Sequence, residues 1–139
     1  MKIYKRCALL ISALAVIFSA FILPEKVCFA NGENGVFYCG DSSKNCNIVS
    51  AGNFPLLTKL TLTDVCGESA EYKSFDLQAF LQSVNGEILF LEELCDSVNY
   101  YCKADLPYSV ELYGHTVNLH ISIKDNGVKV ASPIIFGGY

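Results

Sequence analysis

Apolar and polar residues alternate most regularly in the last thirty-two residues of the chain. In the middle segment, 115–124, every second residue is apolar: Val117, Leu119, Ile121 and Ile123. The segments 108–113 and 128–136 flank it, joined by turn-forming residues at 113–115 and 125–127. Because alternate side chains of a strand point to opposite faces, this pattern predicts an antiparallel three-stranded meander with one apolar face and one solvent-facing polar face.

The last predicted strand, 128–136, contains Pro133, which has no backbone N–H to donate to a ladder. We therefore expect this strand to lie at an edge of the sheet or to carry a bulge at Pro133. Three consecutive apolar residues, 134–136, follow the proline. They either complete the core or form an exposed edge that pairs with a second subunit.

Four earlier segments are predicted to be strands. Those at 36–39 and 46–50 are short, and 56–66 alternates leucine with threonine as a half-buried strand does. The segment 87–94 is more continuously apolar and is predicted to be a buried strand. These segments are separated by turn-forming residues and therefore indicate a chain rich in short strands.

The segment 75–84 is compatible with two structures. Its apolar residues fit a helical stripe, with Ser74 as a candidate N-cap and Asn85-Gly86 as a C-terminal stop. The same Asn85-Gly86 pair suits a two-residue hairpin turn. We favour the helix. The predicted fold class is mainly β: a small antiparallel sandwich, barrel or sheet with one short helix at about 75–84, stapled by disulfides.

The N-terminal segment has the layout of a secretory signal peptide. Three basic residues precede an apolar run from 7 to 23, and the small residues Cys28 and Ala30 stand two apart after it. The run is at the short end for a membrane-spanning helix. We predict cleavage after Ala30, and rank a cut after Ala20 second because a bulky residue lies two positions before it.

This cleavage divides the chain into a signal peptide, 1–30, and one small domain, 31–139. The protein is then exported, to an extracellular, periplasmic or cell-surface location, and has no stable membrane span after processing. The domain holds six lysines, no arginine and thirteen acidic residues, and six minus thirteen gives a formal charge of −7. Nucleic acids and anionic membranes attract clustered positive charge, so neither is an expected partner.

Five cysteines fall in the predicted mature domain, and an oxidising compartment favours disulfides. Cys39 and Cys46 are separated by six residues, as are Cys95 and Cys102. We predict two local bridges, Cys39–Cys46 and Cys95–Cys102, although the sequence also allows a long-range bridge through Cys66. With both local bridges closed, Cys66 is a free thiol or links two copies into a homodimer. Structural zinc sites favour closer cysteine pairs, so no metal is expected.

The sequence offers little for catalysis. Its two histidines, His115 and His120, are five residues apart and so face opposite sides of a strand, which prevents them from sharing a metal. We expect His115 in a turn and His120 on the solvent-facing side of the meander. The sequence contains no nucleophile elbow, zinc-protease helix motif or phosphate-binding loop. We therefore expect neither an enzyme nor a bound cofactor.

Four tyrosines lie close together in the sequence: Tyr100, Tyr101, Tyr108 and Tyr113. Tyrosine is enriched at binding surfaces, and with His120 these residues are candidate contacts for a partner. The leading hypothesis is a secreted, disulfide-containing module that binds a protein or glycan outside the cytoplasm. The alternative is a structural or assembly protein of the cell surface that pairs through its C-terminal edge strand. A secreted hydrolase is the third class.

Overall fold

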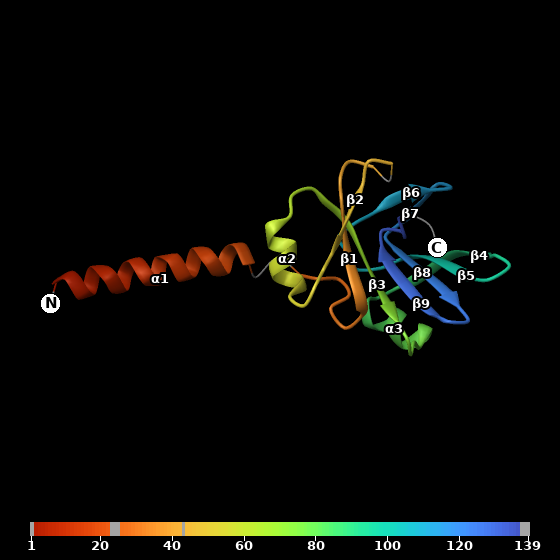
Figure 1. Cartoon of the computed structure of the whole chain (residues 1–139), viewed down its shortest axis with the longest axis horizontal. Coiled ribbons are helices and arrows are strands. Elements are labelled where there is room, and N and C mark those ends of the chain that lie inside the picture. Colours follow the sequence, from red (N-terminus) through yellow and green to blue (C-terminus); the bar gives the residue numbers. More distant parts are fainter. Residues whose placement is uncertain (1, 23–25, 43, 137–139) are drawn as a thin grey trace.

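The computed structural model of the chain describes residues 2–22, 26–42 and 44–136. A helix, α1 (Lys2–Ile22), precedes a β-rich body (Figure 1). Within α1, the segment Ile3–Ala20 is long and apolar enough to span a membrane, with a mean hydropathy of 1.7, and none of it is buried. An apolar helix at this position is compatible with a signal sequence.

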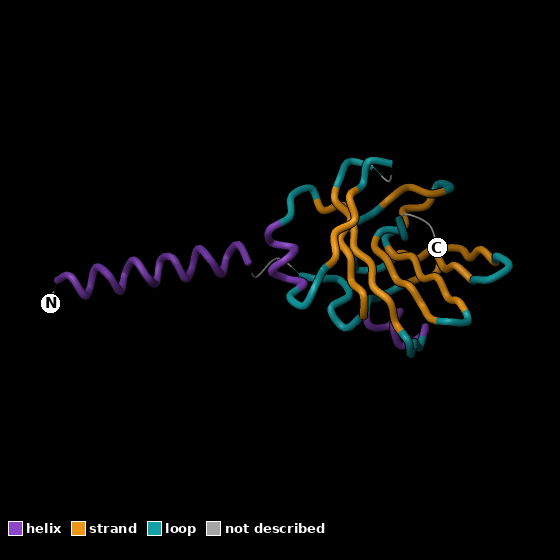
Figure 2. Tube along the Cα trace, in the orientation of Figure 1, coloured by secondary structure: helices purple, strands orange, loops and turns teal. Residues whose placement is uncertain are grey.

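The body is built on one antiparallel sheet of seven strands in the order β2-β1-β3-β9-β8-β5-β4, with a separate β6–β7 hairpin. Figure 2 shows that strands are the main regular structure of the body. The prediction of a mainly β fold is confirmed. The strands are β1 (Glu33–Cys39), β2 (Asn47–Ser50), β3 (Val65–Tyr72), β4 (Glu87–Glu93), β5 (Val98–Lys103), β6 (Val110–Leu112), β7 (His115–Val117), β8 (Leu119–Lys124) and β9 (Gly127–Ser132).

One face of the sheet carries the apolar core. Alternate residues of β8 and β9 are fully buried there, and helix α3 (Leu77–Ser83) packs against them. The helix predicted at 75–84 is confirmed. Its N-cap is Asp76 rather than Ser74, because the Asp76 carboxylate accepts a hydrogen bond from a backbone N–H of the first turn at 3.0 Å.

The opposite face is buried as well, so the prediction of a solvent-facing side was wrong. Three of its polar side chains are at most 2% exposed: Asn99, His120 and Ser122. The chain beyond β9 packs over this face. The Phe136 ring lies 4.7 Å from the ring of Tyr38, and Ile135 is 8% exposed. The three apolar residues at 134–136 therefore help to cover the sheet.

The strand predicted at 56–66 is instead helix α2 (Pro55–Thr61), and strand β3 begins only at Val65. Pro55 stands at the start of α2, where its fixed φ favours a helix and its missing N–H costs nothing. The Thr58 hydroxyl donates to the carbonyl oxygen of Ala51 at 2.9 Å and holds the helix to the preceding loop. An alternation of leucine and threonine therefore does not distinguish a strand from a short helix here.

The long strand predicted at 115–124 is interrupted at Asn118, which separates β7 from β8. The Asn118 side chain pairs with the backbone of Ala104, donating to its oxygen at 2.5 Å and accepting from its nitrogen at 2.6 Å. These two hydrogen bonds fix the end of β5. The chain before Asn118 can therefore leave the large sheet, and β7 pairs with β6 instead.

The position predicted for the last strand was also wrong, because β9 pairs with β3 on one side and with β8 on the other. β9 ends at Ser132, so Pro133 lies beyond the ladder and removes no hydrogen bond from it. The sheet edges are β2 and β4. β4, predicted as a buried strand at 87–94, is an edge strand with mostly exposed side chains.

Candidate functional site

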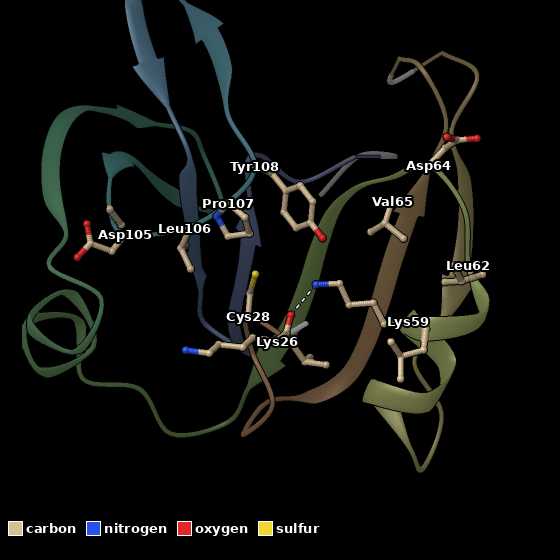
Figure 3. A pocket seen from close by; sticks show the side chains of 13 residues that line it. Lys26, Cys28, Lys59, Leu62, Asp64, Val65, Asp105, Leu106, Pro107 and Tyr108 are labelled. Atoms are coloured by element: carbon tan, nitrogen blue, oxygen red, sulfur yellow. Dashed lines mark hydrogen bonds between the residues drawn. The ribbon is translucent and has the colours of Figure 1, made fainter. Parts of the chain in front are cut away.

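A large pocket lies where the segment after α1 meets α2 and the sheet. Its volume is about 1280 Å³, and its lining comes from 26–28, from the end of α2 with the loop that follows, and from 104–108 (Figure 3). Figure 3 shows Lys59 and Tyr108 pointing toward one another across this pocket. The pocket therefore joins three segments that are distant in the sequence.

A buried ion pair adjoins the pocket through Lys59, which lines it. Lys59 Nζ is 2.8 Å from Glu68 Oε1, and the two side chains are 7% and 2% exposed. The Tyr108 hydroxyl donates to Glu68 Oε1 at 3.2 Å, and the backbone N–H of Cys28 donates to Glu68 Oε2 at 2.7 Å. Lys59 also donates to the carbonyl oxygen of Lys26, the bond dashed in Figure 3. Both charges are thus compensated, as buried charges must be.

The titration of these groups favours a structural network over a reactive one. Burial, and then the charge of Glu68, raises the pKa of the Cys28 thiol to about 12. Burial also raises the pKa of Tyr108 to about 12. Burial opposes the charge of Lys59, but its hydrogen bonds to Glu68 and Tyr108 more than compensate, so the Lys59 pKa is raised. At neutral pH the thiol and phenol are protonated and the ammonium is charged, so none of the three is an activated nucleophile.

Sequence reasoning missed this ion pair. Lys59 lies in the segment 56–66, which the sequence predicts to be a strand. Glu68 lies in β3, whose residues are small and polar and give no apolar run that would predict a buried strand. A lysine within the apolar stretch 56–62 was the only local signal, and it is equally typical of a solvent-facing position.

The five residues predicted to contact a partner do not form one surface. Tyr113 is 87% exposed at the turn of the β6–β7 hairpin. Tyr101 and His120 stack inside the molecule with ring centroids 4.5 Å apart. Tyr100 packs against the apolar core, and Tyr108 lines the pocket beside α2. Of the five, Tyr113 alone presents most of its side chain to solvent.

His120 is a buried neutral histidine, contrary to the prediction of a solvent-facing one. Its Nδ1 accepts a hydrogen bond from the backbone N–H of Ile135 at 3.2 Å, so the ring proton lies on Nε2, which is 3.3 Å from Asn99 Oδ1. Burial lowers the pKa of His120 to about 4. The ring is therefore uncharged at neutral pH.

An exposed apolar surface lies on edge strand β4. Figure 1 shows the β4–β5 hairpin projecting from the body of the sheet. Three apolar side chains on or beside β4 are 42–52% exposed: Ile88, Leu91 and Leu94. The Phe90 ring lies between Tyr101 at 4.6 Å and Tyr113 at 5.8 Å, which links β4 to the β6–β7 hairpin. We call Ile88, Phe90, Leu91, Leu94 and Tyr113 the β4 edge surface.

Three cysteines lie at the same end of neighbouring strands. Cys39 of β1 pairs with Asn47 of β2 and with Val65 of β3, so Cys46 and Cys66 each lie one residue from a partner of Cys39. Burial, and then the neighbouring Cys46 thiol, raises the pKa of both Cys39 and Cys66. All three are free thiols in this structure. We call them the thiol triad.

The other predicted bridge does not fit the β4–β5 hairpin. Cys95 is exposed in the turn that joins the two strands, whereas Cys102 lies near the far end of β5 and is fully buried. The extended strand from Val98 to Cys102 alone spans about 13 Å. Bridged cysteines have Cα atoms about 4.4–6.8 Å apart. A Cys95–Cys102 disulfide therefore requires this hairpin to come apart.

No group of three histidine, cysteine or acidic side chains could hold a metal ion among the residues that the structure describes. Comparison of the chain with models of protein families, with curated proteins and with solved structures found no match. The structure thus defines a mainly β body, built on a seven-stranded antiparallel sheet, with an apolar helix before it.

Proposed function

We propose that this protein is an exported binding module that adds an extended segment of a partner protein to the edge of its sheet at β4. The observation that carries the proposal is an open edge lined by half-exposed apolar side chains. Among the residues that the structure describes, β4 pairs with β5 alone, so the backbone groups on its other side have no strand partner there. Added strands bind such edges through main-chain hydrogen bonds and gain specificity from alternate side chains.

The charges on β4 define the chemistry of the partner segment. Exposed acids stand at both ends of the strand, with Glu87 before the apolar stretch and Glu92 and Glu93 after it. A second copy of β4 would place acids opposite acids in either orientation, which destabilises pairing. The charges favour a different protein whose strand has an apolar centre and lysine or arginine at its ends. Tyr113 lies beside this edge and adds an aromatic contact.

Assembly through the C-terminal strand has less support than this proposal. Strand β9 has neighbours on both sides, so it has no open ladder to offer a second subunit. Binding of a glycan through Tyr113 is the competing class. It uses the aromatic ring alone and does not require the backbone groups of β4.

Selection from a displayed library of seven-residue peptides tests the proposal on the exported protein. We expect enriched peptides to alternate apolar residues between basic ends and to protect the β4 amides from hydrogen exchange. Leu91→Lys should abolish binding. The matched control is Ile48→Lys, which alters an equally exposed apolar residue on the other edge strand, β2, and should leave binding intact.

Two results would contradict strand addition. One is enrichment of peptides whose binding is the same for Leu91→Lys and for the unchanged protein. The other is selective binding to a glycan array that Tyr113→Ser abolishes, with no peptide enriched. The second result would assign the surface to glycan recognition.

We also propose that the disulfide staple of the domain lies within the thiol triad. Two of its thiols form an S–S bond and pass two electrons and two protons to an oxidant such as glutathione disulfide. The oxidant is thereby reduced to two glutathione thiols. Non-reducing peptide mapping of the exported protein should find one bridge among Cys39, Cys46 and Cys66. A Cys95–Cys102 bridge in that map would contradict both this proposal and the β4–β5 hairpin.

A further inference from the structure

The segment predicted to end the signal peptide is built into the folded domain. Phe29 is 5% exposed and belongs to the apolar core, where its ring lies 6.4 Å from that of Phe80 on α3. The carbonyl oxygen of Phe29 accepts a hydrogen bond from Gly32 N at 3.0 Å, which closes a turn into β1. A cut after Ala30 would remove this aromatic ring from the core and leave its space unfilled.

The same segment completes the buried ion pair. The N–H of Cys28 is a partner of Glu68 Oε2 at 2.7 Å, and the carbonyl oxygen of Lys26 is a partner of the Lys59 ammonium. A chain that began at Asn31 would lack both backbone groups. Glu68 and Lys59, which are 2% and 7% exposed with the segment in place, would then each lose a hydrogen-bond partner.

We propose that the mature protein retains Lys26–Ala30, and that any signal-peptide cleavage occurs on the N-terminal side of Lys26. Cleavage is hydrolysis of one peptide bond, in which water adds and a new carboxylate and a new ammonium form. The second-ranked site of the sequence, after Ala20, lies on this side of Lys26, although bulky Phe18 stands two positions before it. Cys28 is then a cysteine of the working protein, which has six cysteines after a cut at Ala20 and seven if α1 is retained.

This inference does not rest on the proposed binding function. The segment 26–30 lies against α2, α3 and β3, whereas the proposed binding surface lies on β4 and the β6–β7 hairpin. A failure of peptide binding therefore leaves the inference intact, and the reverse also holds.

Intact-mass measurement of the full chain after expression in a secreting host tests the inference directly. The sample is reduced, denatured and alkylated, so that the mass gives the first residue and the number of cysteines together. A chain that starts at or before Lys26, with six or seven alkylated cysteines, supports the proposal. A chain that starts after Lys26, including one that starts at Asn31 with five alkylated cysteines, overturns it.

A substitution at Phe29 gives an independent readout. If Phe29 is retained, Phe29→Ala lowers the thermal midpoint of the exported protein by roughly 10 °C or more, and Phe29→Leu lowers it less. The control Leu14→Ala alters an exposed side chain of α1 and should leave the midpoint unchanged. If Phe29→Ala prevents export, the Phe29→Leu midpoint decides. Midpoints equal to that of the unchanged protein for the measurable variant would overturn the proposal.

Discussion

The sheet buries one polar network on each face, and the two networks differ in charge. Glu68 lies two residues before Ala70 on β3, so its side chain shares the apolar face, where it pairs with Lys59. On the opposite face, His120 and Asn99 form a neutral contact. The same sheet thus buries an ion pair on one side and an uncharged imidazole on the other.

Backbone groups from near the ends of the chain complete both networks. Lys26 and Cys28 supply an acceptor and a donor to the ion pair, and Ile135 supplies a donor to His120. A buried charge needs its countercharge, whereas a buried neutral imidazole must avoid becoming charged. The comparison teaches that the first network fails when a partner is removed and the second fails when a proton is added.

Loss of the countercharge should have the largest effect. Glu68→Gln keeps the shape of the side chain but leaves the Lys59 ammonium buried without an anion. We expect a loss of about 3–5 kcal/mol in the free energy of unfolding, measured by urea denaturation.

The double variant Lys59→Met with Glu68→Leu is the control, because it removes both charges and keeps apolar volume in their place. We expect it to be clearly more stable than Glu68→Gln alone. A loss of less than 1 kcal/mol in Glu68→Gln would mean that water reaches Lys59, and the two networks would then not differ as described.

Acidification should have the next largest effect, and it acts on the other network. The pKa of His120 is about 4 in the folded protein and near its ordinary value of 6.5 when unfolded. The unfolded chain therefore binds the proton first. The stability contributed by the neutral ring is fully present above pH 6.5 and is lost as the pH falls to 4. The loss reaches about 3 kcal/mol.

Urea denaturation from pH 7 to pH 4.5 measures this loss against His120→Gln, which cannot titrate. Tyr101 and Asn99 pack against the ring and are present in both proteins, so the difference between the two curves reports the titration of His120. The pH dependence of the unchanged protein should therefore be steeper than that of the variant. Parallel curves would show that His120 is not held neutral.

The sequence predicts the outline of this fold from local patterns. Helix α3 and strands β1, β2, β4 and β9 follow from hydrophobic periodicity and from turn-forming residues, and the structure has all five near the predicted positions. Strand β5 was not predicted, because Cys95 and Cys102 were expected to close a short loop in this segment. The order of the strands was not predictable, because it depends on pairings between residues far apart in the chain.

The site was less predictable than the fold. The alternation around His120 is real, but a polar face indicates solvent only when no other segment covers it. Here residues 135 and 136 cover it, and their sequence shows only that they are apolar. The ion pair depends in the same way on backbone groups at 26 and 28, which carry no sequence signal. Among the predicted contact residues, only the exposure of Tyr113 could be inferred locally, because this residue stands in a turn.

The smallest expected effects come from two buried serines that lie on opposite faces. Ser132 is opposite Glu68 on the apolar face, and its Oγ donates to the carbonyl oxygen of Asn118 at 2.8 Å. Ser122 lies two residues from His120 on the other face, and its Oγ has no hydrogen-bond partner among the residues that the structure describes. Their exposed fractions are 0% and 2%, so the pair differs chiefly in hydrogen bonding.

Replacing each serine with alanine compares a buried hydroxyl that has a hydrogen-bond partner with one for which the structure describes none. Ser132→Ala should lower the free energy of unfolding by about 1 kcal/mol, because it removes a hydrogen bond and leaves the carbonyl oxygen of Asn118 without this donor. Ser122→Ala should be neutral or stabilise by up to about 1 kcal/mol, because it removes a desolvated hydroxyl that gains nothing in the folded state. Thermal and urea unfolding resolve this difference when both variants are measured together. An equal loss in both would show that Ser122 has a partner, such as a buried water. The neutral face would then be as fully satisfied as the charged one.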